Sequence, residues 1–303
     1  MVDAKSTANT NAPADGAPWA NVGRVNGGAS GIYIAAGWVL TAAHVGSGNL
    51  ALDMITLPYD GISHRLTNSD GTITDLVLFH VSQNAPLPSL PLASSPPAVN
   101  SVVDYIGCGY IAASGPVPIG NYTGFPWSSS AIKGWGNNKV STINFVYNAG
   151  QGNVTLFSTS FDATGQTSDE CQATDGDSGS AVFQKSGSTW QLVGVTDLVG
   201  SVADQPANTS VYGDGTYAAQ ISTYRNQILG WLGSIPPTLS VTKSGTSINV
   251  CWPDPGLPYT LQSTSALVPS GWSTVSQAQA PTNGMICVSV PATNHASFFR
   301  LQR

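Results

Sequence analysis

Charged residues are scarce in this chain of 303 residues, since only 9% of them are Asp, Glu, Lys or Arg. Helical bundles and coiled coils need charged, helix-forming faces, so the composition argues against both. Gly (33) and Pro (20) are abundant instead. Such a composition suits short strands joined by many turns. Disorder is disfavoured, because 41% of the residues are hydrophobic and 8 are Trp.

Basic residues and long apolar runs are also few. The chain has 10 Lys and Arg against 16 Asp and Glu, with a pI near 4.9. No basic patch is available to neutralise phosphates, so we expect no nucleic-acid partner. The longest apolar run, 32–40, is interrupted by Gly37 and is much shorter than the roughly 20 residues of a membrane span. No apolar segment follows Met1, so we expect no signal peptide in this chain.

Short apolar or alternating runs recur from Trp19 onward, whereas residues 1–18 show no periodicity and are predicted to be a flexible lead-in. The runs are bounded by Gly, Pro, Asn or Asp, which predicts an all-β barrel or sandwich. The expected strands are 31–36, 37–42, 50–57, 76–81, 102–106, 154–157, 180–184 and 190–196. Apolar residues at helical spacing predict one helix at about 222–232, with Ser222 as its N-cap.

The paired prolines Pro236 and Pro237 follow this helix and cannot continue it, so we expect a domain boundary there. The first domain would then be 19–234 and the second 235–303. Short alternating runs in the second domain resemble small fibronectin- or immunoglobulin-like β-sandwich modules. A module of this size is only marginally stable by itself. Residues 235–303 are a candidate for docking to a surface or to a substrate.

The four cysteines have no Cys-x-x-Cys spacing, so we expect no metal site. They permit three disulfide pairings. One pair in each domain is the simplest, namely Cys108–Cys171 and Cys251–Cys287. Two disulfides would imply an oxidising compartment. The alternative is four buried thiols.

Three short motifs carry residue types used in nucleophilic catalysis. His44 follows a strand that ends in small residues, Thr41-Ala42-Ala43. Ser178 lies in Gly176-Asp177-Ser178-Gly179, where glycines permit a tight turn with backbone N–H groups open to a carbonyl. Asp75 begins an apolar strand, where a buried carboxylate needs a partner.

Each motif taken alone has an ordinary explanation. A single histidine is commonly structural, and Gly, Asp and Ser are common in polar turns. Asp75 could be a solvated turn carboxylate, with Asp53, Asp60 or Asp70 in its role instead. The motifs therefore gain their meaning from their combination.

Together the motifs resemble the chymotrypsin/trypsin family of serine peptidases, in the chain order His44, Asp75, Ser178. In α/β-hydrolases the order is Ser, Asp, His. Residues 192–196 are similar to the strand that lines the family's specificity pocket, and 215–218 to the strand before its terminal helix. The resemblance covers about 19–234.

The resemblance implies two six-stranded β-barrels of chymotrypsin type ending in a C-terminal helix, with the small β-sandwich appended. It implies a secreted serine endopeptidase acting on protein or peptide substrates. Ser178 would be the nucleophile, His44 the general base and Asp75 the group that orients the histidine. The N–H groups of Gly176 and Ser178 would form the oxyanion hole. No cofactor is implied. The alternatives are a catalytically silent homologue that acts as a binding module, and an acyl hydrolase on the same fold.

The resemblance also points to a substrate pocket. Its floor falls on Gln172, and a neutral floor argues against strict cleavage after Arg or Lys. Asp197 stands where the family usually has Ser. The remaining candidate pocket residues are Asp175, Leu198, Val199 and Gly215.

Two further features bear on activation and location. Many family members pair a freed N-terminal amine with the acid before the serine, which is Asp177 here. Arg24-Val25 is too close to His44 to be the cleavage site, so the partner of Asp177 is left open. Val45 replaces the cysteine that usually follows the histidine, a pattern typical of bacterial members. We expect a secreted or periplasmic protein of undetermined oligomeric state.

Overall fold

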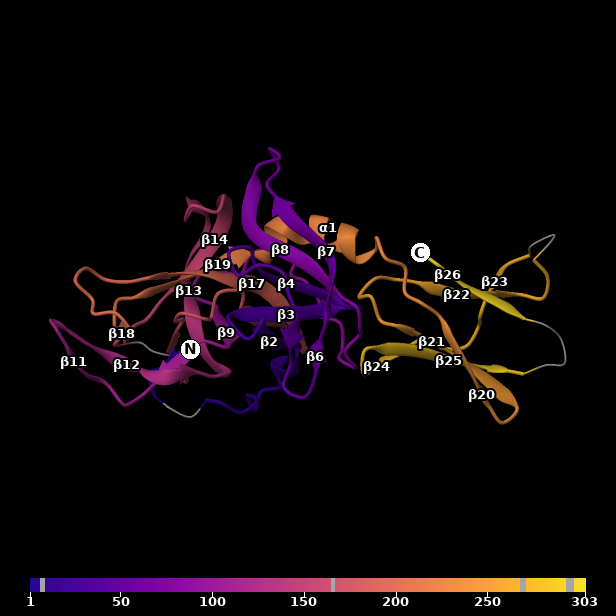
Figure 1. The fold of residues 1–303 in the computed structure, drawn as a ribbon, viewed down its shortest axis with the longest axis horizontal. Coiled ribbons are helices and arrows are strands. Elements are labelled where there is room, and N and C mark those ends of the chain that lie inside the picture. The colour runs from indigo at the N-terminus through magenta and orange to yellow at the C-terminus, as the bar shows by residue number, and fades with distance from the viewer. Residues whose placement is uncertain (6–8, 165–166, 268–270, 293–296) are drawn as a thin grey trace.

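The computed structural model describes residues 1–5, 9–164, 167–267, 271–292 and 297–303. Strands dominate this part of the chain, and it contains one α-helix, α1 (Ile221–Leu232). A larger body is formed by the chain up to α1, and a smaller body by the residues after it (Figure 1). The predicted all-β fold with a C-terminal helix is confirmed. No helix among the described residues is long and apolar enough to cross a membrane.

The first sheet of the larger body has seven described strands, where the resemblance implied six. Their order is β6 (Thr56–Leu57), β5 (Leu50–Ala51), β2 (Val22–Val25), β3 (Ser30–Ala35), β4 (Trp38–Ala42), β8 (Ile73–Val81) and β7 (Tyr59–Thr67). β3 and β4 are buried along their whole length, as their continuous apolar runs require. The segment 50–57, expected to be one strand, forms the two short strands β5 and β6, which pair with each other. The turn between them is closed by a hydrogen bond from the Leu52 N–H to Ile55 O at 2.8 Å.

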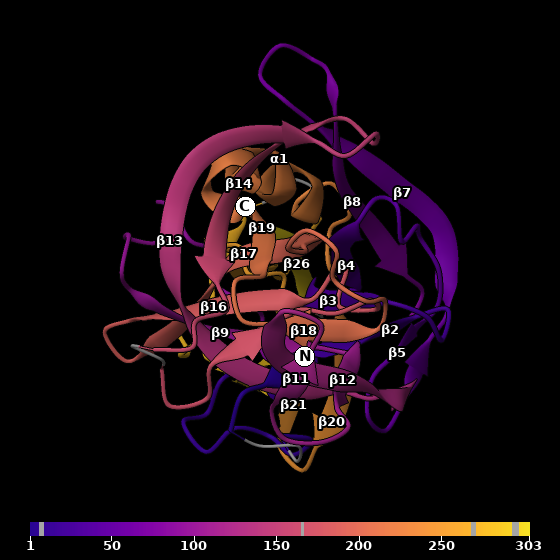
Figure 2. The ribbon, with the colours of Figure 1, turned by 90° about the vertical axis from the view of Figure 1, so that its left-hand side faces the viewer.

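The second sheet is a closed barrel of six strands. Their order is β13 (Gly134–Asn148), β14 (Asn153–Ser160), β19 (Gly215–Gln220), β17 (Thr189–Gly200), β16 (Ala181–Ser186) and β9 (Val102–Gly107). Figure 2 shows β13 arching along one side of this barrel. The predicted strand 154–157 is part of the longer strand β14, which pairs with β13 in a hairpin. A smaller sheet lies beside the barrel and contains β10 (Tyr110–Ala112), β11 (Val117–Ile119), β12 (Tyr122–Ala131) and β18 (Thr209–Val211).

One hydrophobic core joins the two large sheets and α1. It contains Ile32 and Leu78 from the first sheet, and Leu156 and Leu192 from the second. The helix adds its buried face, Ile221, Tyr224, Ile228 and Leu232. Burying each large apolar side chain contributes about 1.5–3 kcal/mol, so this shared core fixes the two sheets against each other. The helix begins one residue before the predicted N-cap Ser222, and Gln220 precedes it without a side-chain cap.

Part of the segment expected to be a flexible lead-in forms a strand. β1 (Val2–Asp3) pairs with β15 (Cys171–Gln172). Met1 and Val2 are buried. A short 3-10 helix (Trp19–Asn21) precedes β2. Among the described residues of this segment only a few are buried, which explains the lack of hydrophobic periodicity, and strand pairing holds Val2 and Asp3.

The described residues of the C-terminal segment form two small sheets. One contains β20 (Ser240–Ser244), β21 (Ser247–Pro253), β25 (Met285–Pro291) and β24 (Pro281–Thr282), and the other β23 (Ser273–Thr274), β22 (Thr260–Thr264) and β26 (Phe298–Gln302). Their side chains share a core around the fully buried Trp252. The module contacts the larger body through Ser89, whose hydroxyl donates to Asp254 Oδ2 at 2.7 Å.

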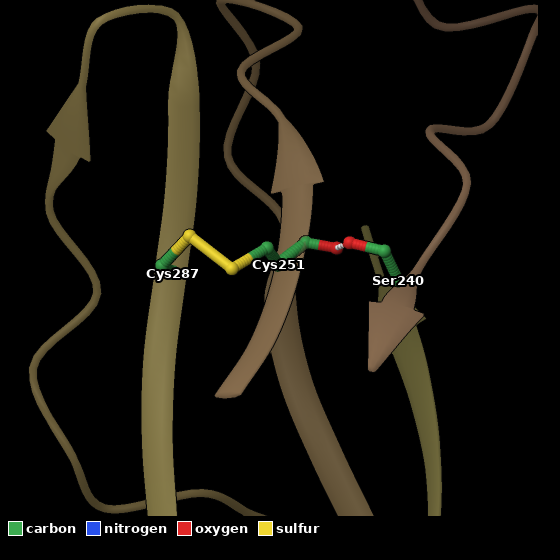
Figure 3. The surroundings of a disulfide bond; sticks show 3 residues. All are labelled: Ser240, Cys251 and Cys287. Carbon is green, nitrogen blue, oxygen red and sulfur yellow. Dashed lines mark hydrogen bonds between the residues drawn. A yellow bond between two sulfur atoms is a disulfide. The ribbon is translucent and has the colours of Figure 1, made fainter. Parts of the chain in front are cut away.

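The disulfides only partly match the expected pairing. Cys251 and Cys287 are opposite each other on β21 and β25 and form a disulfide (Figure 3). Cys108 and Cys171 are free, buried thiols, so the expected Cys108–Cys171 bond is wrong. The two thiols lie in different surroundings: Cys171 is paired with β1, whereas Cys108 follows β9 and donates its N–H to the Ser30 hydroxyl at 2.9 Å.

Candidate active site

His44 and Asp75 are brought together where β4 ends and β8 begins. The Ala43 N–H donates to Asp75 O at 3.0 Å, which continues the pairing of the two strands. The Asp75 carboxylate accepts two bonds from His44, one from ring Nδ1 at 2.7 Å and one from the backbone N–H at 2.8 Å. With Nδ1 donating, Nε2 is the basic nitrogen of the neutral ring.

Electrostatic interactions set the protonation states of His44 and Asp75. Burial alone would raise the pKa of Asp75, but its bonds to His44 and the charge of the imidazolium lower that pKa below its usual value. The hydrogen bond that the His44 ring donates to Asp75 is the main cause that raises the pKa of His44. Asp75 therefore remains ionised, and His44 is a stronger base than a free imidazole.

Ser178 lies in a loop whose backbone requires glycine. Gly176 and Gly179 have φ angles of 85° and 80°, in the left-handed region. A Cβ on Gly179 would collide with Thr41 Oγ1 and with the carbonyl oxygen of Ser30. In the described part of the chain, the N–H groups of Gly176 and Ser178 donate to no protein acceptor. These are the two donors that the family resemblance predicts for an oxyanion hole.

Asp177 forms an ion pair with a partner that the sequence analysis left open. Its Oδ2 lies 2.9 Å from the amino group of Met1, and both groups are fully buried. The same carboxylate accepts N–H bonds from Gly109 at 2.8 Å and Thr174 at 2.9 Å. The Met1 amine also donates to Tyr110 O at 2.9 Å. The apolar pair Met1-Val2, ahead of a polar segment, was the only sequence signal of this contact.

Ser30 joins the serine loop to the first sheet, a role that the sequence analysis missed. Its hydroxyl donates to Gly176 O at 2.9 Å, and its N–H donates to Ser178 O at 2.9 Å. Its own carbonyl accepts a bond from the Thr41 hydroxyl at 2.6 Å. Ser30 therefore fixes the loop against the strand that leads to His44.

The three residues of the expected triad share one cavity of about 340 Å³. Its lining consists of His44, Asp75, Ala149, Gln151, Thr174, Asp175, Ser178, Asp197, Leu198 and Val199. Four of the candidate pocket residues are thus beside the triad. The other two, Gln172 and Gly215, are not part of this lining: the Gln172 amide is turned inward and donates to Gly215 O at 2.9 Å.

A comparison with models of protein families shows to which family this chain belongs. The family model of the trypsin-like peptidase domain matches residues 29–195, more than half of the chain, including His44, Asp75 and Ser178. The chain belongs to this family. Among curated proteins, no match was found.

In this trypsin-like peptidase domain, a second, more apolar hollow of about 270 Å³ adjoins the triad cavity. The two share Ala149, Leu198 and Val199. The β13–β14 hairpin supplies further walls of the hollow, including Phe145 and Tyr147. These residues were missed because the sequence did not reveal that hairpin.

Asp197 is a further acidic residue in the cavity of this peptidase domain that contains His44 and Asp75. It is 4% exposed, and its Oδ1 lies 3.9 Å from His44 Nδ1. Burial is the main cause that raises the pKa of Asp197 to about 8, and the charge of Asp75 adds to it. Asp197, which the sequence analysis placed among the pocket candidates, therefore lies beside His44 of the expected triad.

Proposed function

We propose that this protein is a secreted serine endopeptidase in which Ser178, His44 and Asp75 form the catalytic triad. The observation that carries the proposal is the 2.7 Å bond between His44 Nδ1 and Asp75, in a cavity that also contains Ser178. The family supports a peptidase hydrolase with protein substrates.

The reaction follows from the roles of these groups. His44 Nε2 accepts the proton of the Ser178 hydroxyl while its oxygen attacks the scissile carbonyl carbon. The N–H groups of Gly176 and Ser178 stabilise the resulting oxyanion. The imidazolium then protonates the leaving amine, and an acyl-enzyme remains. Water, deprotonated by His44, releases the acid and restores Ser178.

Substrate preference follows from the walls beside the triad. The apolar hollow formed with Leu198, Val199 and Tyr217 suits an apolar side chain near the scissile bond. Gln172 is neutral and fully buried, so it offers no carboxylate to a basic side chain. We therefore expect cleavage of peptides that carry apolar residues at this position, and not strict cleavage after Arg or Lys.

An oxidising location is part of the proposal. The Cys251–Cys287 disulfide supports an extracellular or periplasmic site of action. The role of the C-terminal module in docking remains a proposal too, but Trp252 is not available for it because its side chain is fully buried.

The test compares the wild type with Ser178→Ala on a diverse peptide mixture, with the products sequenced by mass spectrometry. We expect the variant to lose kcat by a factor on the order of a million. Ser186→Ala, an exposed serine on β16, is the matched control and should cleave normally. Equal cleavage by the wild type and Ser178→Ala would disprove the mechanism. No cleavage by either protein would favour the silent homologue that acts as a binding module.

A further inference from the structure

We propose that Asp197 is a positioning residue. It is a neutral carboxylic acid that donates a hydrogen bond to Asp75, and this bond holds Asp75 in the orientation in which it accepts the hydrogen bond from His44 Nδ1. The proposal rests on the triad proposed above. It adds a fourth side chain to the three that carry the reaction, and it makes the activity depend on the protonation of that side chain in mildly alkaline solution.

A bulge in β17 aims Asp197 at the triad. In the pairing of β17 with β19, Thr196 is opposite Ala218 and Leu198 is opposite Tyr217, which leaves Asp197 without a partner residue. A bulged residue changes the direction of its side chain relative to its neighbours. Asp197 consequently lines the same cavity as His44 and Asp75.

The three side chains form a compact cluster. One nitrogen of His44 and one carboxyl oxygen each of Asp75 and Asp197 all lie within 4.8 Å of one another. Asp75 and Asp197 are 2% and 4% exposed. Two carboxylates this close, with so little water, do not both carry a negative charge at neutral pH, because each raises the cost of ionising the other.

The hydrogen bonds decide which carboxyl group keeps the proton. Asp75 receives two bonds from His44, and these stabilise its negative charge. The buried Oδ1 of Asp197 accepts no hydrogen bond from any described residue. The charge therefore belongs on Asp75 and the proton on Asp197. The pKa directions agree, since the pKa of Asp75 is lowered and that of Asp197 is raised to about 8.

The other titratable groups around the cluster do not reverse this assignment. Tyr224 approaches from α1, and burial is the main cause that raises its pKa, so its hydroxyl is neutral here. Arg65 on β7 influences His44, but its guanidinium donates to backbone carbonyl oxygens of Thr74 and Gln151. Within the described residues, His44 is the only basic group that forms an ion pair with Asp197.

Ionisation of Asp197 would disturb the pair in two ways. The hydrogen bond to Asp75 is lost, and the two carboxylates repel each other. In addition, Asp197 Oδ1, at 3.9 Å, becomes a second acceptor for the Nδ1 proton of His44. The imidazole is then held less firmly in the orientation that its bond to Asp75 gives it. We therefore expect activity to fall as the pH passes through about 8. A neutral acid beside a reacting group is an established way to keep a donor at pH 7.

The experiment measures kcat/KM from pH 5 to 10 for the wild type, Asp197→Asn, Asp197→Ser and Asp197→Val. Asn and Ser retain a donor and should stay within about tenfold of the wild type at pH 7, whereas Val, which has none, should lose about 10- to 100-fold. Asp197→Asn should leave the acidic limb unchanged, because one neutral group replaces another, and it should abolish the alkaline fall. Asp204→Asn, an exposed acid with a positive φ that Asn tolerates, is the control and should keep the wild-type profile.

Three kinetic results would overturn the proposal. A downward shift of the acidic limb in Asp197→Asn would show that Asp197 is ionised at neutral pH. An alkaline fall that persists in Asp197→Asn would assign it to another group. Equal activity of the Val and Asn variants at pH 7 would show that no donor to Asp75 is needed.

A second measurement does not depend on peptidase activity. In the Ser178→Ala background, the His44 ring resonances are followed by NMR against pH and assigned with His44→Gln. We expect a second inflection near pH 8 that disappears in Asp197→Asn, and its presence in both proteins would overturn the proposal. If Ser178→Ala cleaves peptides as well as the wild type, the proposed function fails, while this titration still reports on Asp197.

Discussion

The amino group of Met1 lies 2.9 Å from Oδ2 of Asp177, the residue immediately before the nucleophilic serine of the proposed triad. Asp177 also accepts bonds from Gly109 and Thr174. The charge of the amine compensates a carboxylate that is buried completely. The ion pair thus holds the loop that presents the N–H groups of Gly176 and Ser178.

An extra residue in front of Met1 should disrupt this loop. The displaced amine would leave Asp177 as an unpaired buried charge, which costs about 3–5 kcal/mol of stability. We expect kcat/KM to fall at least about a hundredfold, the scale of a lost oxyanion donor. Peptide hydrolysis and thermal melting measure the two effects. The control carries a cleavable extension, and its removal at Met1 should restore activity; full activity with the extension in place would contradict the role of the ion pair.

Asp75→Asn should preserve the shape of the site but lose most of its activity. The amide cannot stabilise the imidazolium of His44 and favours the wrong ring tautomer, so kcat should fall by a factor of about 10⁴. Because Asp75 is the main cause that raises the pKa of His44, the imidazole should titrate at lower pH in the variant. NMR titration of His44 measures this shift. An unchanged His44 titration would argue against the Asp75–His44 bond.

Asp104 on β9 should make the protein less stable in alkaline solution. Burial is the main cause that raises its pKa to about 8, and Asp15 adds to the effect. Between its ordinary pKa and pH 8 the folded state therefore binds more protons at this site than the unfolded state does. The free energy of unfolding should fall as the pH rises through that window, by at most about 1.4 kcal/mol per pH unit.

Urea unfolding at pH 5, 7 and 9 tests this expectation. Asp104→Asn has no such proton to lose, so its stability should decline less steeply than that of the wild type. Asp204→Asn, which is exposed, should follow the wild type. Parallel declines in the wild type and Asp104→Asn would disprove the assignment.

The Cys251–Cys287 disulfide should stabilise the C-terminal module but not the active site. It closes a loop with a sequence separation of 36, and its removal by a double Cys→Ser change should cost about 2–4 kcal/mol. Limited proteolysis should then cut residues 235–303 sooner, while peptide hydrolysis is retained. Thiol titration of the denatured, unreduced wild type should find the two free cysteines, Cys108 and Cys171. Finding none would contradict the structure at these positions.

Much of the site could be predicted from local patterns. The small residues before His44, the glycines around Ser178 and the apolar strand after Asp75 each report a local backbone requirement. Their order along the chain was enough to point to the family, which the family match supports. The helix over 222–232 was predictable for the same reason, since its apolar spacing is contained in one segment.

Contacts between distant segments could not be predicted in this way. The sequence suggested a Cys108–Cys171 bond by counting, but strand pairing puts the two thiols in different surroundings. The β13–β14 hairpin was largely missed, because β13 has exposed residues along much of its second half. The residues that this hairpin contributes to the apolar hollow reach it only because the barrel closes, and that closure joins strands that are far apart in the sequence.

By itself, the sequence determined an all-β chain with a serine loop, a histidine and an acid in the order of a known peptidase family. Only the tertiary structure showed that the Met1 amine reaches Asp177 and that the bulge in β17 turns Asp197 towards His44. The physical reason is that turn and strand preferences act between near neighbours in the chain. Charge pairing and burial depend instead on which distant strands the shared core brings together.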